Sequence, residues 1–146
     1  MKKFFSLFIL CMISTMAMAQ TGGDALINCV WSNTSGTNKI QFFKESNGTY
    51  YAKIVWLKDA LNSDGTPKLD TKNPDKAKRS DKLKGTSVVW GLKYEDGKWA
   101  DGTLYSPTKG MIVKGSVTLN DKGQLMLKGT KWGISQTETF NQEALK

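Results

Sequence analysis

The sequence contains no histidine, and this absence removes several kinds of catalytic site. Ser-His-Asp and Cys-His catalysis both use an imidazole as the base, so neither mechanism is open to this chain. The two cysteines are Cys11, which falls in the predicted leader described below, and Cys29. Once the leader is removed, Cys29 has no intramolecular disulfide partner, and a Cys/His zinc site is excluded. Any enzyme built from this sequence would use carboxylates, lysine, tyrosine or a metal held by oxygen ligands.

Long apolar runs are also scarce, and the longest stands at the N-terminus. Residues 1–19 predict a signal peptide, because two lysines precede an apolar run over residues 4–13 and Ala17-Met18-Ala19 gives the small-x-small pattern of a cleavage site. The run is too short for a membrane anchor, which needs about 20 apolar residues. We therefore expect a mature chain from Gln20, no transmembrane anchor, and a periplasmic or secreted location.

Residues 20–146 predict a single domain, because their number suffices for one core and not for two. The two lysines of the leader account for part of the formal charge, which falls from +8 to +6 when they are removed. A moderately basic surface suits acidic proteins, anionic polymers or membranes, although lysines spread along a chain also serve solubility alone. We expect a monomer without a cofactor, a metal or a nucleic-acid partner.

Short alternating runs rich in aromatic and β-branched residues dominate the rest of the chain, and most are separated by turns that contain glycine. This pattern is typical of antiparallel all-β folds. Eight strands are enough for an up-and-down sheet to close into a barrel without free edges. The sequence therefore predicts an all-β, up-and-down barrel of about eight antiparallel strands, at residues 26–31, 39–44, 50–57, 87–94, 98–105, 111–119, 124–130 and 135–140.

A long polar loop, residues 57–86, separates the third predicted strand from the fourth. Residues 57–85 carry eight basic and five acidic side chains. Loops longer than about 15 residues are usually functional or disordered, so we expect this one to lie over one end of the barrel and to serve a function. Within it, Asn73-Pro74-Asp75 predicts a turn.

Arg79, the single arginine of the chain, lies in this loop. Its planar guanidinium favours a bidentate partner such as a carboxylate or a phosphate. Three interpretations stay open: a local ion pair with Asp75 or Asp81, an anchor that ties the loop to the barrel through Glu138, and ligand binding.

Alternation along the strands predicts which side chains face the core. In the third strand Tyr50, Ala52, Ile54 and Trp56 share the inward face. In the last strand Glu138 shares a face with Phe140, which predicts a buried carboxylate that needs a partner.

The five tryptophans divide by position in the same way. Trp31, Trp56 and Trp90 lie among apolar strand residues and predict core positions. Trp99 and Trp132 lie near turns and are candidates for an exposed stacking surface.

Several blocks of sequence resemble the domain of unknown function 2147 family, a group of small exported bacterial proteins. The resemblance covers nearly all of the predicted mature chain and implies a lipocalin-like, or calycin-type, β-barrel, but no established activity. It rests on Cys29-Val30-Trp31, residues 52–57, Lys72-Asn73-Pro74-Asp75, Arg79-Ser80 with Leu83-Lys84-Gly85, residues 101–107, Gly129 and Thr137-Glu138-Thr139-Phe140.

The sequence departs from the family pattern where Cys29 and Ala52 replace glycines, where Ser106 replaces an aspartate, and where Phe140-Asn141 replaces a tryptophan closely followed by an arginine. In lipocalin-type barrels such a terminal arginine covers the tryptophan of the first strand. The resemblance therefore implies another cover for Trp31, either Arg79 or a lysine. Cys29 is interpreted as a small buried hydrophobe or as a redox-active thiol.

Three functional hypotheses follow. The first is a binding barrel for a small molecule in the cell envelope, with a mouth covered by the long loop. The second is a protein-binding or inhibitor module that contacts an envelope protein through the basic loop. The third is a carboxylate-dependent hydrolase that pairs Glu138 with Asp75 or Asp101. The candidate ligand-binding residues are Tyr50, Trp56, Asn73, Asp75, Arg79, Tyr105 and Glu138.

Overall fold

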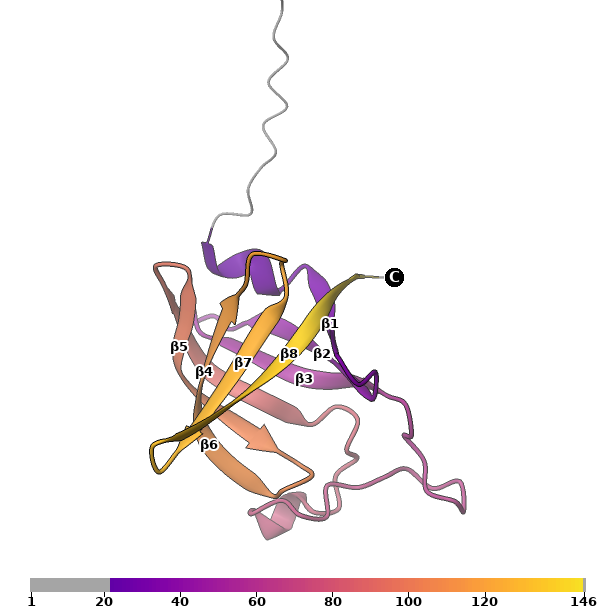
Figure 1. Cartoon of the computed structure of the whole chain (residues 1–146). Coiled ribbons are helices and arrows are strands. Elements are labelled where there is room, and N and C mark those ends of the chain that lie inside the picture. The colour runs from indigo at the N-terminus through magenta and orange to yellow at the C-terminus, as the bar shows by residue number, and fades with distance from the viewer. Residues whose placement is uncertain (1–21, 146) are drawn as a thin grey trace, which may run out of the picture.

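The structure is a computed structural model that describes residues 22–145. The predicted signal peptide, residues 1–19, lies outside the described residues. Eight antiparallel strands form a closed barrel in which each strand pairs with its neighbour in sequence and β8 pairs with β1 (Figure 1). The predicted fold class is confirmed. The strands are β1 (Cys29–Asn33), β2 (Asn38–Lys44), β3 (Tyr50–Leu57), β4 (Ser87–Glu95), β5 (Lys98–Ser106), β6 (Met111–Leu119), β7 (Leu125–Lys131) and β8 (Ile134–Ala144).

The turns form where the sequence supplies residues that accept positive φ. Asp96 and Gly97, between β4 and β5, have φ of 49° and 80°. Two successive positive φ values match the right-handed twist of the flanking strands, which is why Asp-Gly is favoured in two-residue hairpins. Within residues 22–145, neither of the short helices is long and apolar enough to cross a membrane.

A short 3₁₀ helix, η1 (Gly22–Leu26), closes one end of the barrel (Figure 1). Leu26 is fully buried, and its carbonyl oxygen accepts a hydrogen bond of 3.0 Å from Trp31 Nε1. The carbonyl oxygen of Gly23 accepts a second indole hydrogen bond, 3.1 Å long, from Trp99. The hydrogen-bond partner of Trp31 thus comes from η1, and the cover expected from Arg79 or a lysine is not what the structure shows.

Two of the tryptophan predictions are wrong, for different reasons. Trp99 is only 2% exposed, because its indole packs beneath η1. Trp56 is 40% exposed, although Tyr50, Ala52 and Ile54 of the same strand are buried as predicted. A bulge shifts the register between β2 and β3, so that Ile40 pairs with Ile54 while Lys39 pairs with Trp56.

The bulge inserts one residue into β3 and turns Trp56 to the outer face, since a shift of one residue reverses the side on which a side chain lies. There the ammonium of Lys39 lies 5.1 Å from the centroid of the Trp56 ring. Of the other tryptophans, Trp31 is buried as predicted, Trp90 is partly buried, and Trp132 is 86% exposed as predicted.

Cys29 is buried at the start of β1 and is 2% exposed. Burial raises the pKa of its thiol. A buried thiol with a raised pKa behaves as a small hydrophobe rather than as a reactive nucleophile. Between the two interpretations of Cys29, the structure favours the packing role.

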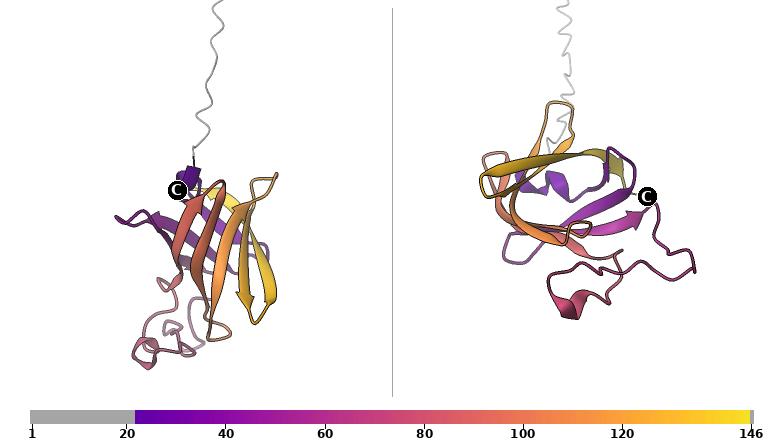
Figure 2. Two further views of the ribbon diagram at one scale, coloured as in Figure 1. Left: turned by 90° about the vertical axis from the view of Figure 1, so that its left-hand side faces the viewer. Right: turned by 60° about the horizontal axis from the view of Figure 1, so that its bottom comes forward.

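The long loop between β3 and β4 is held by its own backbone hydrogen bonds. Asp70 N donates to Asp81 O at 2.9 Å, and Leu83 N donates to Lys68 O at 2.8 Å. A short 3₁₀ helix, η2 (Lys76–Lys78), is capped by the side chain of Asp75, which accepts from Ala77 N. The loop therefore folds as a compact unit, and Figure 2 shows it to one side of the barrel opening.

Candidate functional site

The barrel contains a cavity of about 620 Å³ that opens at the end opposite η1. Its mouth is formed by the turns that join β1 to β2, β5 to β6 and β7 to β8. This volume lies within the range of about 300 to 1,000 Å³ typical of small-molecule sites. The inner part is lined by apolar side chains from six strands: Ile40, Ile54, Leu104, Val113, Leu127 and Phe140.

Two paired glycines help to leave this space open. Gly115 on β6 lies opposite Gly129 on β7. A Cβ added at Gly115 would collide with the side chain of Leu104, and one added at Gly129 would lie 3.0 Å from Val113 Cγ2. Larger residues at these two positions would crowd Leu104 and Val113, so glycine at both positions lets these lining side chains lie close to the wall.

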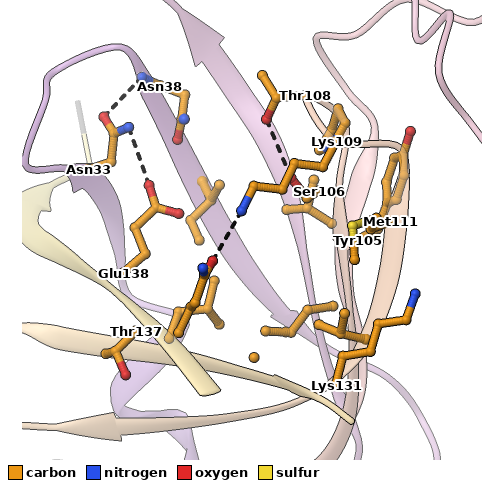
Figure 3. A pocket seen from close by; sticks show the side chains of 18 of the residues that line it. Asn33, Asn38, Tyr105, Ser106, Thr108, Lys109, Met111, Lys131, Thr137 and Glu138 are labelled. Atoms are coloured by element: carbon orange, nitrogen blue, oxygen red, sulfur yellow. Dashed lines mark hydrogen bonds between the residues drawn. The ribbon is translucent and has the colours of Figure 1, made fainter. Parts of the chain in front are cut away.

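Asn33, at the end of β1, is the most constrained polar residue of the cavity wall. Its side-chain oxygen accepts hydrogen bonds from the backbone N–H of Thr37 at 2.9 Å and of Asn38 at 3.1 Å. Its side-chain nitrogen donates to Thr37 Oγ1 at 2.8 Å and to Glu138 Oε1 at 3.5 Å. The turn after β1 thus fixes the amide that faces Glu138 (Figure 3).

Glu138 does share the inward face of β8 with Phe140, and it lines the cavity. It is nevertheless solvent-exposed, so the prediction of a buried carboxylate is wrong. The cavity is open to water at this level, and a hydrated carboxylate needs no cationic partner to offset desolvation.

Two lysines lie at the mouth, and both have partners within the protein. Lys109 Nζ donates to Gln136 Oε1 at 3.0 Å and so links the turn after β5 to β8. The ammonium of Lys131 lies 4.6 Å from the centroid of the Trp132 ring. Figure 3 shows Lys109 and Glu138 reaching into the pocket from opposite walls.

A buried carboxylate, which the sequence analysis missed, ties the long loop to the barrel. Asp70 is 2% exposed. Its two oxygens accept hydrogen bonds from the Tyr105 hydroxyl at 2.6 Å and from Asn73 Nδ2 at 2.7 Å. Burial, and then the hydrogen bond to Asp70, raise the pKa of Tyr105 far above the ordinary value of a phenol. Asp70 stands among charged residues in a polar stretch, so no local pattern marked it.

A second contact joins the loop to the turn after β5. Lys72 Nζ donates to the carbonyl oxygen of Thr108 at 2.9 Å. The backbone of Lys72 lies so close to Gly110 that a Cβ at Gly110 would collide with the Lys72 carbonyl oxygen. Gly110 also has a φ of 61°, which favours glycine.

Arg79 does not anchor the loop in the way that was expected. Its Nε donates to the carbonyl oxygen of Asn73 at 2.7 Å. In the described part of the chain the two ion pairs are Lys39–Glu143 and Lys44–Asp24, so Arg79 pairs with neither Asp75 nor Asp81 and does not reach Glu138. Its contact stabilises the turn of the loop from within.

The long loop and the barrel wall enclose a second hollow, of about 750 Å³. We call it the loop groove. Four lysines line it, together with three aspartates and the side chains of Trp90, Tyr105 and Ile112: the charged residues are Lys53, Lys78, Lys82, Lys84, Asp70, Asp75 and Asp81.

The seven predicted site residues do not form one site. Tyr105 and Glu138 line the cavity, and Tyr105 also borders the loop groove with Asn73 and Asp75. Arg79 lines neither hollow. Tyr50 lies at the closed end, where its hydroxyl donates to Asp24 Oδ1 at 2.8 Å, and Trp56 lies on the outer face.

The prediction that the long loop covers the mouth of the barrel is also wrong. The cavity lining includes no residue between 58 and 86, so the long loop lies beside the mouth and not over it.

Among the described residues that line the cavity, Glu138 is the single carboxylate, because Asp75 borders the loop groove and Asp101 borders neither hollow. The pair of facing carboxylates that the hydrolase hypothesis requires is not present in this cavity. Across residues 22–145, no three Asp, Glu or Cys side chains gather closely enough to hold a metal ion.

The family model described as "Uncharacterized protein conserved in bacteria (DUF2147)" matches residues 29–142, from the first residue of β1 into β8. The chain belongs to the DUF2147 family. The resemblance seen in the sequence is thereby confirmed.

A solved structure supports the fold of this DUF2147 protein. The structure described as "Protein HP1028 from the human pathogen Helicobacter pylori belongs to the lipocalin family" superposes with a TM-score of 0.66. The two chains are 23% identical, and the match covers 82% of this chain and 83% of that one. At this level of identity the likeness establishes a lipocalin-like barrel and nothing about a ligand. A comparison with curated proteins gives no match.

Proposed function

We propose that this protein is a non-enzymatic binding barrel that holds a small, largely apolar molecule in the cell envelope. The observation that carries the proposal is the cavity of about 620 Å³, which is sealed at one end by η1 and open at the other. Apolar side chains line its inner part and a few polar groups surround its mouth, which is the usual arrangement of small-molecule sites. The predicted signal peptide, residues 1–19, supports the location.

Native mass spectrometry of residues 20–146, purified gently from the envelope of the source organism, tests the proposal. A reproducible additional mass of a few hundred daltons that is lost on harsher activation would support a bound cargo and permit its identification. The bare mass in repeated mild preparations would count against the binding function.

A pair of variants makes the test specific to the cavity. Leu127 lines the cavity, whereas the next residue, Lys128, is exposed and lines neither hollow. Leu127→Trp adds bulk to the cavity, and Lys128→Trp places the same side chain on the outer face. We expect the first variant to lose the additional mass and the second to keep it. Equal retention by both would place the cargo outside the cavity.

The loop groove supports a second candidate function, the binding of an acidic segment of an envelope protein. Its lining holds four lysines against three aspartates, and none of these lysines forms an ion pair in the described part of the chain. Trp90 and Ile112 add apolar contact area within the same groove. Lysines arranged beside apolar side chains favour a partner with both acidic and apolar residues.

The double variant Lys82→Glu/Lys84→Glu tests this second candidate, with Lys114→Glu/Lys128→Glu as the control for net charge. An envelope protein bound through the groove should be captured by the wild type and the control, be lost with the groove variant, and dissociate as salt is raised. Capture that is insensitive to the groove variant would exclude the groove as its site.

A further inference from the structure

Charged side chains occur at two depths in the cavity, and this follows from the course of β8. The strand runs from Ile134, next to the β7–β8 turn at the mouth, to Ala144, which pairs with Cys29 near the closed end. Its inward-facing residues are therefore met in the order Gln136, Glu138 and Phe140 from the mouth inward. Glu138 lies between the polar mouth and the apolar floor.

The cationic groups lie further out than Glu138 and are already engaged. Lys109 donates to Gln136, one inward position nearer the mouth than Glu138, and Lys131 stacks on the exposed ring of Trp132. Lys109 is exposed and Lys131 is partly exposed, and each already has a partner within the protein.

The carboxylate of Glu138 is exposed to solvent and has a single hydrogen-bond partner within the described part of the chain. Its Oε1 receives one long hydrogen bond, 3.5 Å, from the neutral amide of Asn33. Its Oε2 has no hydrogen-bond or ion-pair partner among residues 22–145. A carboxylate held at the edge of an apolar pocket provides two acceptors to a donor that enters the pocket, and charge-assisted hydrogen bonds are the stronger kind.

We propose that the ligand of this barrel is a cationic amphiphile, with an apolar body on the cavity floor and an amine that pairs with Glu138. The inference rests on the proposed binding function and names its ligand class. The apolar body contacts the inner lining around Leu104, Val113 and Phe140. The amine then lies at the level of Glu138, whose Oε1 accepts the 3.5 Å hydrogen bond from Asn33 Nδ2 and whose Oε2 accepts none within residues 22–145.

Three probes with the same alkyl chain test the inference by titration calorimetry on residues 20–146 at neutral pH: decylamine, decanol and decanoate. We expect decylamine to bind about tenfold more tightly than decanol, and decanoate to bind no more tightly than decanol. Glu138→Gln should remove the advantage of decylamine over decanol, because the neutral amide gives the ammonium no charged acceptor. Glu45→Gln, which makes the same change of charge at an exposed residue outside the cavity lining, should keep the advantage.

The outcomes separate the two proposals. Decanol binding that Leu127→Trp blocks would show that the barrel binds small molecules. If decylamine then binds no more tightly than decanol, the cationic ligand class is wrong. Tightest binding of decanoate would overturn the inference in favour of the lysines at the mouth. An amine advantage that survives Glu138→Gln would also overturn it. If none of the three probes binds while the native mass shows a cargo that Leu127→Trp removes, the cationic ligand class is wrong and the binding function stands.

Discussion

The side chain of Asp70 is almost inaccessible to water. Its hydrogen bonds therefore determine how much of the desolvation free energy is offset. A buried charge is tolerated when donors replace the water it has lost. The hydroxyl of Tyr105 and the amide of Asn73 supply one donor to each oxygen. Asp70 and Asn73 both belong to the long loop, whereas Tyr105 belongs to β5, so the hydrogen bond from Tyr105 also holds the loop against the barrel.

Tyr105→Phe removes the donor to Asp70 Oδ1 and leaves a buried acceptor unsatisfied. We expect the free energy of unfolding to fall by about 1 to 3 kcal/mol, and the lysine-rich loop to become more sensitive to trypsin. Urea unfolding and limited proteolysis measure the two effects. Tyr94→Phe is the control, because Tyr94 is 37% exposed. Equal changes in the two variants would show that the Asp70 contact contributes nothing.

The raised pKa of Tyr105 predicts how this stabilisation depends on pH. The folded state binds the phenolic proton more tightly than the unfolded chain, in which the pKa is about 10. The protonated Tyr105 hydroxyl therefore contributes its full share of the free energy of unfolding below about pH 10. This share falls by roughly 1.4 kcal/mol for each pH unit as pH rises toward the folded pKa. The difference in free energy of unfolding between wild type and Tyr105→Phe should shrink from about pH 9 to pH 11. A constant difference would contradict this prediction.

Single residues were harder to place from the sequence than strands, and three of them show why. Trp56 follows the alternation of its strand until a bulge reverses it, and nothing in the local sequence marks that bulge. Trp99 lies next to a turn, yet a helix from the other end of the sequence covers it. Asp70 is buried only because Tyr105 reaches it across 35 positions of sequence. In each case a distant partner decides the environment.

The helix η1 has little helical signal of its own, but much of the closed end depends on it. Its sequence, GGDAL, is too short to show an amphipathic period, and Leu26 was assigned to the first strand. Once folded, η1 supplies the acceptors for the indoles of Trp31 and Trp99 and the carboxylate partner of Tyr50. By contrast, the strands were predictable because alternation and turn residues are local properties of the chain.

Leu26→Ala should weaken this closed end. Leu26 is fully buried among the aromatic side chains of the core, so the substitution removes apolar contacts and leaves a cavity. We expect the free energy of unfolding to fall by about 2 to 5 kcal/mol. Chemical unfolding followed by tryptophan fluorescence measures the change, because the buried Trp31 and Trp99 lie beside η1. Leu145→Ala, at a residue that is 50% exposed, is the control and should change stability little.

The molecule as a whole is a tube with one sealed end and one open end, and this shape follows from the up-and-down topology. Successive connections lie at opposite ends and alternate ones at the same end, so the long loop shares the open end with the turns that form the cavity mouth (Figure 1). The sequence predicted the closed barrel and the loop. It predicted Tyr50, Tyr105, Asn73, Asp75 and Arg79 near one mouth, whereas Tyr50 lies at the closed end and Asn73 and Asp75 border the loop groove.

The predicted signal peptide implies a defined N-terminus for the mature protein. If residues 1–19 are removed after Ala19, the intact mass should correspond to a chain that begins at Gln20. Intact-mass measurement of the envelope and cytoplasmic fractions tests this. Ala17→Lys/Ala19→Lys, which abolishes the small residues at the cleavage site, should leave the uncleaved chain. A chain with residues 1–19 still attached in the wild type would contradict the prediction.

The pairing of β1 with β8 has a consequence for how the protein reaches its native state. These strands come from opposite ends of the chain, with Cys29 beside Ala144. The barrel therefore closes only after β8 has been synthesised and is free to pair with β1. Contacts between such distant residues slow folding, and until they form, β1 and β8 are unpaired edges on which other chains could assemble. The period between synthesis and closure is therefore when this chain most needs protection from aggregation.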